Sequence, residues 1–333
     1  MKAITRRTAL QALTATVLPL VAQLAAAGVL PGPIVNAAWL AENAGKVQII
    51  EVRGNPKSFT ATPSLETDPK TGKKSVEDVG GHLPGSRLFD TKPMRADRKY
   101  GELTVKYMIP ERADFQRVVQ AAGIDADKPI VLVPMGADVA DVNDALRMYW
   151  QLKVYGEDEV AVLDGGMAGW LLAGRPYSTE AVAPRTGTWV SKADRTERYF
   201  ATSGDVAQAQ AAKSATLVDA RDARQFHGLA KRDYVAAYGH LDGAKLYPTE
   251  LMQKSASGVV SFMAPATYKG LMAAQGIDPA APAITYCNSG HLSSGPWFLL
   301  SEVLGNPAVK LYDGSLHQWT LEKRPLAGAV PLN

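Results

Sequence analysis

Short apolar runs alternate with amphipathic stretches along most of the chain, and the same order of runs occurs twice. The first series holds VQIIEVR (47–53), PIVLVPM (129–135) and VAVLDGG (160–166), and the second holds TLVDAR (216–221), AITYC (283–287) and VKLYDGS (309–315). Such runs, bounded by polar or glycine-rich turns, are typical of strands buried on both faces. Helical patterns such as 145–156 and 297–305 separate them. The sequence therefore predicts an α/β fold with two repeats, each a mainly parallel sheet flanked by helices.

The two repeats divide the chain into segments with different expected roles. Residues 34–177 form the first predicted domain and residues 201–326 the second. Residues 178–200 lack either periodicity and are predicted to be the linker between them. Within the first repeat, residues 55–80 are rich in Pro, Thr, Lys and Gly, which favours a solvated surface loop. A flap over a cleft, or a contact for a partner, is the alternative for this insert.

Residues 1–27 are predicted to be an export signal. Lys2, Arg6 and Arg7 precede an uncharged apolar stretch that ends in an A-x-A cleavage pattern at 25–27. The segment TRRTAL (5–10) resembles a twin-arginine signal, with a general secretion signal as the alternative. Thr, Gln and Pro dilute the apolar stretch, so no stable membrane span is expected. A periplasmic location follows from this interpretation.

Charge and residue counts exclude several classes of protein. The formal net charge is +3, and the predicted signal carries three basic residues and no acidic ones, so the remainder is close to neutral. No nucleic-acid-binding surface is therefore expected. The chain has five histidines without ligand spacing and one cysteine, which cannot supply a zinc site or an internal disulfide. We expect no metal and no other cofactor.

The only cysteine, Cys287, directly follows the predicted strand at 283–286. It precedes a predicted helix that Ser293 or Ser294 caps and that Gly305 ends. Loop amides and the positive end of the helix favour negative charge there, which would lower the pKa of the thiol and give a thiolate nucleophile. A buried structural cysteine is the alternative, although the polar loop argues against it. A cysteine phosphatase would need an arginine at the position of Ser293.

Motifs shared by both repeats resemble those of the tandem-domain rhodanese and mercaptopyruvate sulfurtransferase family. Each repeat has an acidic-x-Arg motif after its first strand, a G-H-L-x-G turn, and a D-G-[GS] segment that closes on a tryptophan. These motifs lie at 51–53 and 219–221, at 81–85 and 239–243, and at 164–170 and 313–319. The resemblance implies two rhodanese-like domains. The first is expected to be non-catalytic, because 135–141 contains no cysteine, and the motif arginines, Arg53 and Arg221, are expected to be ion-paired to a nearby carboxylate.

The same resemblance implies a sulfurtransferase. Such an enzyme moves a sulfane sulfur from a small anionic donor, of the thiosulfate or 3-mercaptopyruvate type, to a thiol or protein acceptor through a Cys287 persulfide. The loop expected to hold that persulfide consists of Asn288, Ser289, Gly290, His291, Leu292 and Ser293. Its C-N-S-G start is closer to the C-G-S-G of mercaptopyruvate-type enzymes. A low-turnover sulfur carrier or redox-sensing binding protein is the alternative, and a thiol oxidoreductase would lack a resolving cysteine.

Comparison with the family also indicates three residues outside the loop. Asp90 and Tyr107 match an aspartate and a histidine that form a proton relay with the loop serine. A tyrosine is a poor proton carrier at neutral pH, so this substitution weakens the relay. Gln225 occupies the position of a substrate-binding arginine, and the neighbouring Arg224 is the candidate replacement. Lys231 and Arg232 are further candidates.

Histidines near the loop allow several interpretations. As a cation, His291 would attract an anionic donor and lower the pKa of Cys287. As a neutral group it could shuttle a proton to the leaving thiol, and a plain solvent-facing loop residue is the third possibility. His317 and Trp319, after the last predicted strand, are weaker candidates for the border of the pocket.

Overall fold

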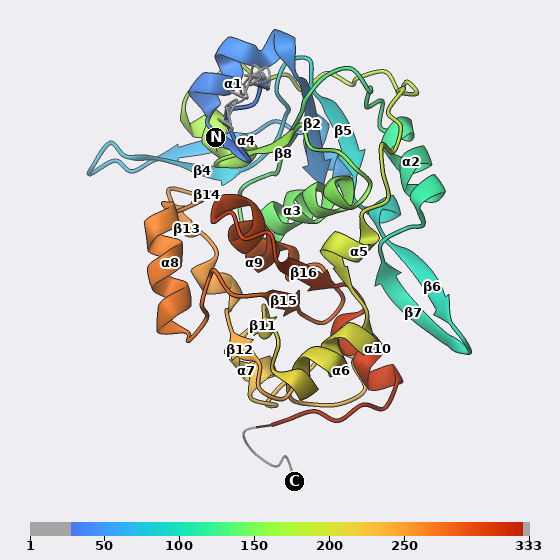
Figure 1. Ribbon diagram of the computed structural model, residues 1–333. Helices are drawn as coiled ribbons and strands as arrows, with labels where there is room; N and C mark the ends of the chain where they lie inside the picture. Colours follow the sequence, from blue (N-terminus) through green and yellow to red (C-terminus); the bar gives the residue numbers. More distant parts are fainter. Residues whose placement is uncertain (1–27, 329–333) are drawn as a thin grey trace, which may run out of the picture.

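The protein is described by a computed structural model that covers residues 28–328, so the predicted signal at 1–27 lies outside the described residues. Two five-stranded sheets form the centres of two domains (Figure 1). Their strand orders are β1-β9-β8-β2-β5 and β10-β16-β15-β11-β12. All neighbouring strands within each of these sheets are parallel. The predicted fold class is confirmed.

The two sheets have corresponding strands and helices. The first domain contains β1 (Ile34–Val35), β2 (Gln48–Arg53), β5 (Arg87–Asp90), β8 (Ile130–Val133) and β9 (Val160–Leu163), with helices α1 (Ala37–Asn43), α2 (Arg112–Ala121), α3 (Val139–Val154) and α4 (Gly166–Leu172). The second contains β10 (Phe200–Ala201), β11 (Thr216–Asp219), β12 (Lys245–Leu246), β15 (Ala283–Tyr286) and β16 (Val309–Tyr312), with helices α5 (Thr196–Tyr199), α6 (Ser203–Ala212), α7 (Ala223–Phe226), α8 (Pro265–Ala274), α9 (Ser294–Phe298) and α10 (Ser315–Leu321). The fully buried strands β8 and β15 occupy the middle of their sheets.

Helices α3 and α9 bring the domains together, since they pack against each other between the two sheets (Figure 1). Tyr149 on α3 stacks edge-on against Phe298 at 4.9 Å, and its hydroxyl donates to Glu302 at 2.9 Å. Trp150 on α3 and Trp297 on α9 are fully buried in the same apolar cluster. The domains therefore share a continuous core at the edge where β15 ends.

The helix predicted to follow Ser293 or Ser294 and to end at Gly305 is present, but its second half is not a regular α-helix. It begins at Ser294 and widens into a π-helical turn, η5 (Leu299–Val303), in which the Leu304 N–H donates to the Leu299 carbonyl at 2.9 Å. Ser293 is the N-cap residue, but its side chain makes no capping hydrogen bond. Gly305 ends the helix with φ +73°, as predicted.

Three antiparallel hairpins extend from the domains. They are β3 (Ser64–Thr67) with β4 (Lys74–Asp78), β6 (Ala96–Tyr100) with β7 (Leu103–Met108), and β13 (Lys254–Ala256) with β14 (Val259–Ser261). The prediction of a plain loop at 55–80 was wrong, because this insert contains the short 3-10 helix η2 (Pro56–Thr60) and the first hairpin. Val76 is buried beside Val259 and its N–H donates to the Ser257 carbonyl at 3.0 Å. This contact with the second domain orders the hairpin, and composition alone cannot reveal it.

The segment predicted as a linker, 178–200, packs on the first domain before it enters β10. Trp189 is fully buried, and its indole N–H donates to Glu157 at 3.0 Å. The ring also meets Phe115 edge-on at 5.9 Å. The segment has little regular structure, yet it contributes to the core.

Each repeat has a buried ion pair at the end of its first long strand, which confirms the predicted pairing of the motif arginines. Arg53 contacts Glu51 at 2.5 Å and Arg221 contacts Asp219 at 2.7 Å, with all four side chains buried. The same arginines donate to the carbonyls of Gly81 at 2.8 Å and Gly239 at 2.9 Å. Those glycines have φ +70° and +108°, which only glycine adopts easily. The acidic-x-Arg motif thus fixes the G-H-L-x-G turn in both domains.

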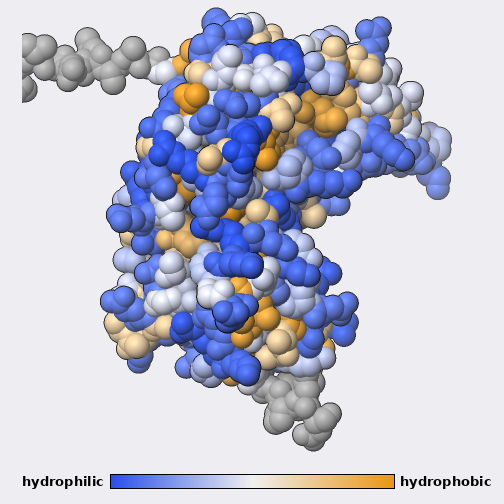
Figure 2. All heavy atoms as spheres, turned by 90° about the vertical axis from the view of Figure 1, so that its right-hand side faces the viewer, coloured by the Kyte–Doolittle hydropathy of each residue, from blue (hydrophilic) through white to orange (hydrophobic). Residues whose placement is uncertain are grey.

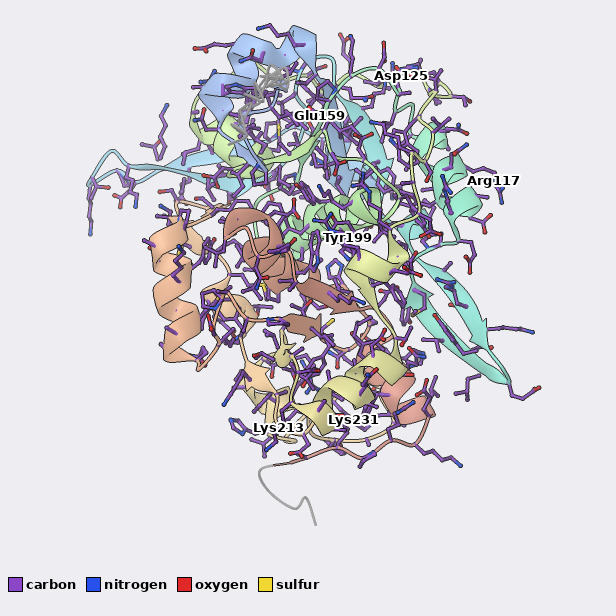
Figure 3. The ribbon with its side chains drawn as sticks, viewed as in Figure 1. Arg117, Asp125, Glu159, Tyr199, Lys213 and Lys231 are labelled. Carbon is purple, nitrogen blue, oxygen red and sulfur yellow. The ribbon has the colours of Figure 1, made fainter. Side chains whose placement is uncertain are left out.

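The Arg53 pair should be important for stability. The substitution Arg53→Met leaves Glu51 charged, buried and unpaired, so we expect a loss of about 3–5 kcal/mol in the free energy of unfolding. Arg117→Met serves as the control, because Arg117 pairs with Asp114 on the exposed outer side of α2 (Figure 3). Its cost should stay below about 1 kcal/mol. Urea unfolding of both variants checks this, and equal costs would contradict it.

Candidate active site

Cys287 follows β15 directly, at the carboxyl edge of the central strand of the second sheet. Its side chain is nearly enclosed, with an exposed fraction of 2%. Seven residues, 287–293, separate the strand from α9. Ligands of open parallel sheets bind at this edge, where loops from neighbouring strands converge. The loop after β16 lies beside it, because the Leu316 N–H donates to the Cys287 carbonyl at 3.2 Å.

Ser315 fixes the shape of the cysteine loop. Its hydroxyl oxygen accepts hydrogen bonds from the N–H groups of Cys287 and Gly290, both at 3.1 Å, and donates to the Tyr312 carbonyl at 2.8 Å. Two of the seven loop amides are therefore already occupied. Within the described residues, the amides of Asn288, Ser289, His291, Leu292 and Ser293 donate to no protein oxygen. Of the amides from Asn288 to Ser293 that the sequence suggested as donors to the sulfur, that of Gly290 is therefore occupied by Ser315.

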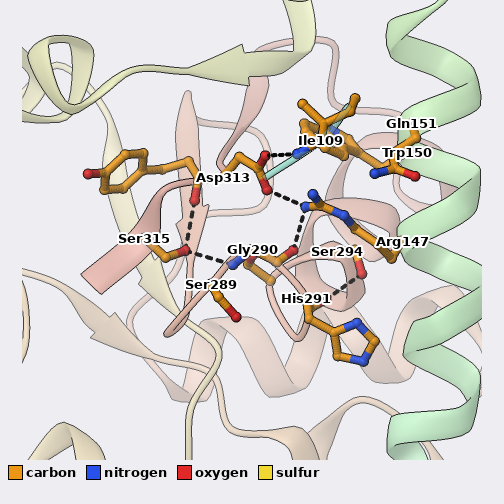
Figure 4. A network of polar contacts seen from close by, with 12 residues as sticks. Ile109, Arg147, Trp150, Gln151, Ser289, Gly290, His291, Ser294, Asp313 and Ser315 are labelled. Carbon is orange, nitrogen blue, oxygen red and sulfur yellow. Dashed lines mark hydrogen bonds and ion pairs between the residues drawn. The ribbon is translucent and has the colours of Figure 1, made fainter. Parts of the chain in front are cut away.

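Arg147, from α3 of the first domain, reaches the cysteine loop (Figure 4). One of its nitrogens, Nη1, donates to the Gly290 carbonyl at 3.0 Å and to Asp313 at 2.5 Å. The other oxygen of Asp313 accepts the Ile109 N–H at 2.6 Å. Sequence reasoning missed Arg147, and the available signal was a charged residue in the middle of an apolar helical pattern.

His291 is not the cation that one sequence interpretation required. Burial lowers the pKa of His291 well below its usual range, and the nearby cations Arg95 and Arg147 lower it further. The ring is therefore neutral at pH 7. Its Nε2 lies 3.6 Å from Asp144, and burial raises the pKa of that carboxyl to about 7. A positive charge that attracts a donor must come from elsewhere.

The remaining loop side chains mostly serve packing. The side-chain amide nitrogen of Asn288 donates to the side-chain oxygen of Gln225 at 2.8 Å, so the glutamine in the expected arginine position supports the loop. Leu292 packs against the shared core, and Ser293 is fully buried. The Ser289 hydroxyl lies 3.4 Å from the hydroxyl of Tyr234. Ser289 therefore connects the loop to the group of aromatic side chains around Tyr234.

Tyr107 is brought to this cleft, whereas Asp90 is not joined to it. Tyr107 on β7 has φ +66°, and its ring lies 5.2 Å from the Tyr234 ring and 6.4 Å from the His317 ring. Asp90 ends β5 and accepts the Lys92 N–H at 2.9 Å. No hydrogen bond in the described part of the chain connects Asp90 with Ser289, so the relay expected from the family is incomplete. His317 borders the site as expected, while Trp319 belongs to the core below it.

Within residues 28–328, no cationic candidate of the second domain makes a hydrogen bond or ion pair with the cysteine loop. Arg224 is exposed on α7, and its side chain makes no hydrogen bond or ion pair within residues 28–328. Lys231 lies in the lower part of the second domain (Figure 3), with its ammonium group 5.5 Å from the Tyr238 ring. Arg232 is exposed and belongs to the same surface stretch.

Arg95, directly before β6, is the candidate for the missing positive charge and belongs to the first domain. It lines a cavity of about 400 Å³ with Thr91, Lys92, Asp97 and Tyr107. Its guanidinium group lies 6.0 Å from the centre of the Tyr107 ring. Burial and then Arg147 lower the pKa of Arg95, while Asp144, Cys287 and Asp313 act in the opposite direction. Arg95 therefore faces the same set of charges as the cysteine loop, and Figure 2 shows the surface hollowed between the two domains.

Other kinds of site find no support in the described residues. Between residues 28 and 328, no group of three or more His, Cys, Asp or Glu side chains is arranged to hold a metal ion. In the same part of the chain, no helix combines the length and the apolar character that a membrane crossing requires.

Comparison with known proteins agrees with the motifs. The family described as "Rhodanese-like domain" matches residues 36–173 and 202–322. A Mycolicibacterium smegmatis protein named "Putative thiosulfate sulfurtransferase" is 32% identical, over 80% of this chain and 90% of its own. The Escherichia coli 3-mercaptopyruvate sulfurtransferase is 27% identical, over 86% of this chain and 94% of its own. The Thermus thermophilus protein "Sulfur carrier protein TtuD" is 29% identical, over 76% and 88%.

A solved structure of SseA from Escherichia coli, described as a 3-mercaptopyruvate sulfotransferase, has a TM-score of 0.64 at 24% identity and covers 85% of this chain and 98% of its own. This likeness supports the fold. The repeated domain match establishes the class: the chain belongs to the rhodanese family. The relatives named as thiosulfate and 3-mercaptopyruvate sulfurtransferases support a sulfurtransferase enzyme within it.

Gly290 offers a test of how tightly the loop is packed. A methyl group there would lie 2.2 Å from Asp313 and 2.7 Å from Arg147, whereas at Gly305, with nearly the same φ, it meets nothing within 4 Å. Gly305→Ala should therefore cost only backbone strain of about 1–2 kcal/mol. Gly290→Ala should cost about 1–3 kcal/mol more, because it overpacks the loop.

Urea unfolding of both glycine variants measures these costs. Alkylation of Cys287 in the folded variants reports on the loop, and only Gly290→Ala should change its rate. Equal losses of stability in the two variants would show that the loop yields to the extra methyl group.

Proposed function

We propose that Cys287 is the nucleophile of this sulfurtransferase and carries the transferred sulfur as a persulfide. The observation that carries the proposal is the position of the cysteine in a seven-residue loop with five amides that have no protein acceptor. Backbone N–H groups directed into a water-poor site stabilise developing negative charge without a cost of reorganisation. The same loop would thus serve the thiolate and the terminal sulfur of the persulfide.

The proposed reaction has two steps. The Cys287 thiolate attacks the outer sulfur of the donor, the bond between that sulfur and the rest of the donor breaks, and its electron pair leaves with the donor remnant. With thiosulfate the remnant is sulfite. An acceptor thiolate then attacks the outer sulfur of the persulfide, and the electron pair of the S–S bond returns to Cys287. Covalent catalysis of this kind divides one transfer into two easier displacements.

The charges around the site favour a small anionic donor. His291 is neutral and Gln225 replaces the arginine expected from the family, so the loop itself offers no cation. Arg95 and Lys92 line a cavity large enough for a donor of this size. Both donor types carry negative charge, and either fits this interpretation. A sulfur carrier with slow turnover is the second candidate, favoured by the relative of that name and the neutral loop.

Intact mass spectrometry tests the nucleophile. Incubation of the protein with thiosulfate or 3-mercaptopyruvate should add one sulfur atom, and the Cys287→Ser variant should gain nothing. Addition of cyanide or a thiol should then remove the sulfur and restore the original mass. Multiple cycles per minute would indicate the enzyme, and a single slow discharge the carrier. A wild-type protein that stays unmodified with both donors would refute the proposal.

Arg95 should determine the affinity for the donor. Removal of its charge by Arg95→Gln should raise the KM for thiosulfate about tenfold or more, because charge-assisted hydrogen bonds contribute about 1.5–3 kcal/mol. The rate at which preformed persulfide passes its sulfur to an acceptor should not change. Lys99→Gln is the matched control, since Lys99 is exposed on β6, the strand that directly follows Arg95. Donor KM values for both variants decide this, and an unchanged KM in Arg95→Gln would exclude the role.

We also propose that the protein acts in the periplasm after export through the signal at 1–27. The twin-arginine resemblance at 5–10 supports this proposal. Cell fractionation and N-terminal sequencing of the mature protein test it, and a cytoplasmic protein that retains Met1 would refute it.

A further inference from the structure

The N-terminal domain lacks a cysteine, yet it holds the loop of the other domain. Arg147 and Asp313 have no exposed side-chain area, and they link three segments: α3, the cysteine loop at Gly290, and Ile109 at the end of β7. Two of these segments belong to the first domain. Trp150 supports the guanidinium group from one turn along α3, with the ring centre 4.7 Å away.

This contact fixes the orientation of a peptide group. The Gly290 carbonyl points to Arg147, and the chain contains no cis peptide within the described residues. In a trans peptide the N–H points opposite to the carbonyl, so the His291 N–H is turned away from Arg147. That amide is one of the five without a protein acceptor. On the other side of Gly290, Ser315 holds the N–H of the preceding peptide.

We propose that Arg147 is a positioning residue for sulfur transfer: it acts through the Gly290 carbonyl to orient the loop amides that stabilise the sulfur. The inference rests on the proposed role of Cys287. It gives the first domain a direct part in the reaction, and it explains why the residue at 290 has no side chain. A Cβ at that position would overlap both members of the ion pair.

An alternative is that the pair only stabilises the interface between the domains. Burial of an ion pair is costly, and apolar residues of similar volume often stabilise a protein equally well. Within the described residues, Nε and Nη2 of Arg147 lack a hydrogen-bond partner. The guanidinium group therefore uses only part of its hydrogen-bonding capacity, which is unfavourable for a purely structural ion pair. The buried pair of Arg53 and Glu51 provides the comparison, because it belongs to the first domain and does not contact the loop.

The experiment compares Arg147→Lys with Arg53→Lys in the full-length protein. The single-turnover rate constant for persulfide formation should fall about 10²-fold in Arg147→Lys, the loss typical of a displaced stabilising donor, with little change in KM. The amplitude of the turnover counts the active molecules and should be preserved. Arg53→Lys should lose stability and keep the wild-type rate constant per active molecule. If Arg147→Lys fails to fold, Asp313→Asn replaces it with the same expected result.

Hydrogen exchange provides a readout that does not depend on sulfur transfer. In Arg147→Lys the amides of 288–293 should exchange faster while the remaining sheet amides keep the wild-type rates. A rate constant within threefold of wild type, or faster exchange throughout the second domain, would overturn the positioning role. If the wild-type protein forms no persulfide, the proposed function fails by itself, and exchange in the loop still decides whether Arg147 positions it.

Discussion

The hydrogen-bonded ion pair between Arg147 and Asp313 is the interaction on which the geometry of the site depends. Both side chains are fully buried, and the carboxylate receives one donor from α3 and another from the backbone of Ile109. Charges without access to water must be satisfied where they lie, so small shifts of the domains would leave one of them uncompensated. Because an unpaired buried charge is costly, the pair favours one relative position of the two domains beside the cysteine loop.

In the proposed reaction, the stabilisation of sulfur and the attraction of the donor belong to different parts of the structure. The loop offers amide dipoles and a neutral His291, which do not bind sulfur through a full opposite charge. The cation that acts on the same region, Arg95, belongs to the first domain and lines the cavity proposed for the donor. Covalent catalysis requires an intermediate that is stable enough to form and labile enough to pass on its sulfur. Loop amides that stabilise the sulfur by their dipoles, together with the charge of Arg95 outside the loop, would let the persulfide form and still pass on its sulfur.

The features that could be predicted from the sequence are those encoded by repeated motifs or by short local patterns. The two sheets, the glycine turns and the Arg53 and Arg221 pairs all followed from patterns present twice, and Cys287 from its place after a strand. Residues whose roles depend on the meeting of distant segments were missed. Arg147 is a single charged residue in a largely apolar stretch of α3. Ser315 is a serine shortly after a strand with no distinguishing motif, and Arg95 is one of several basic residues close to the β6–β7 hairpin. Local rules also fail for η5 and for the hairpin in 55–80, where contacts across the fold decide the structure.

The first repeat shows how a duplicated site can acquire a supporting role. At the position equivalent to the cysteine loop, Asp138 caps α3 and forms a reciprocal capping box with Asp141. Five residues, 134–138, separate β8 from α3, compared with seven before α9, and two carboxylates occupy this turn. The two helices also differ in length: α3 has 16 residues, whereas α9 has 5 before its π-helical turn. That length allows α3 to lie along α9 and to carry Arg147 to the cysteine loop. Under the proposed function, the first repeat therefore supports the cysteine loop of the second through Arg147 and has no cysteine of its own.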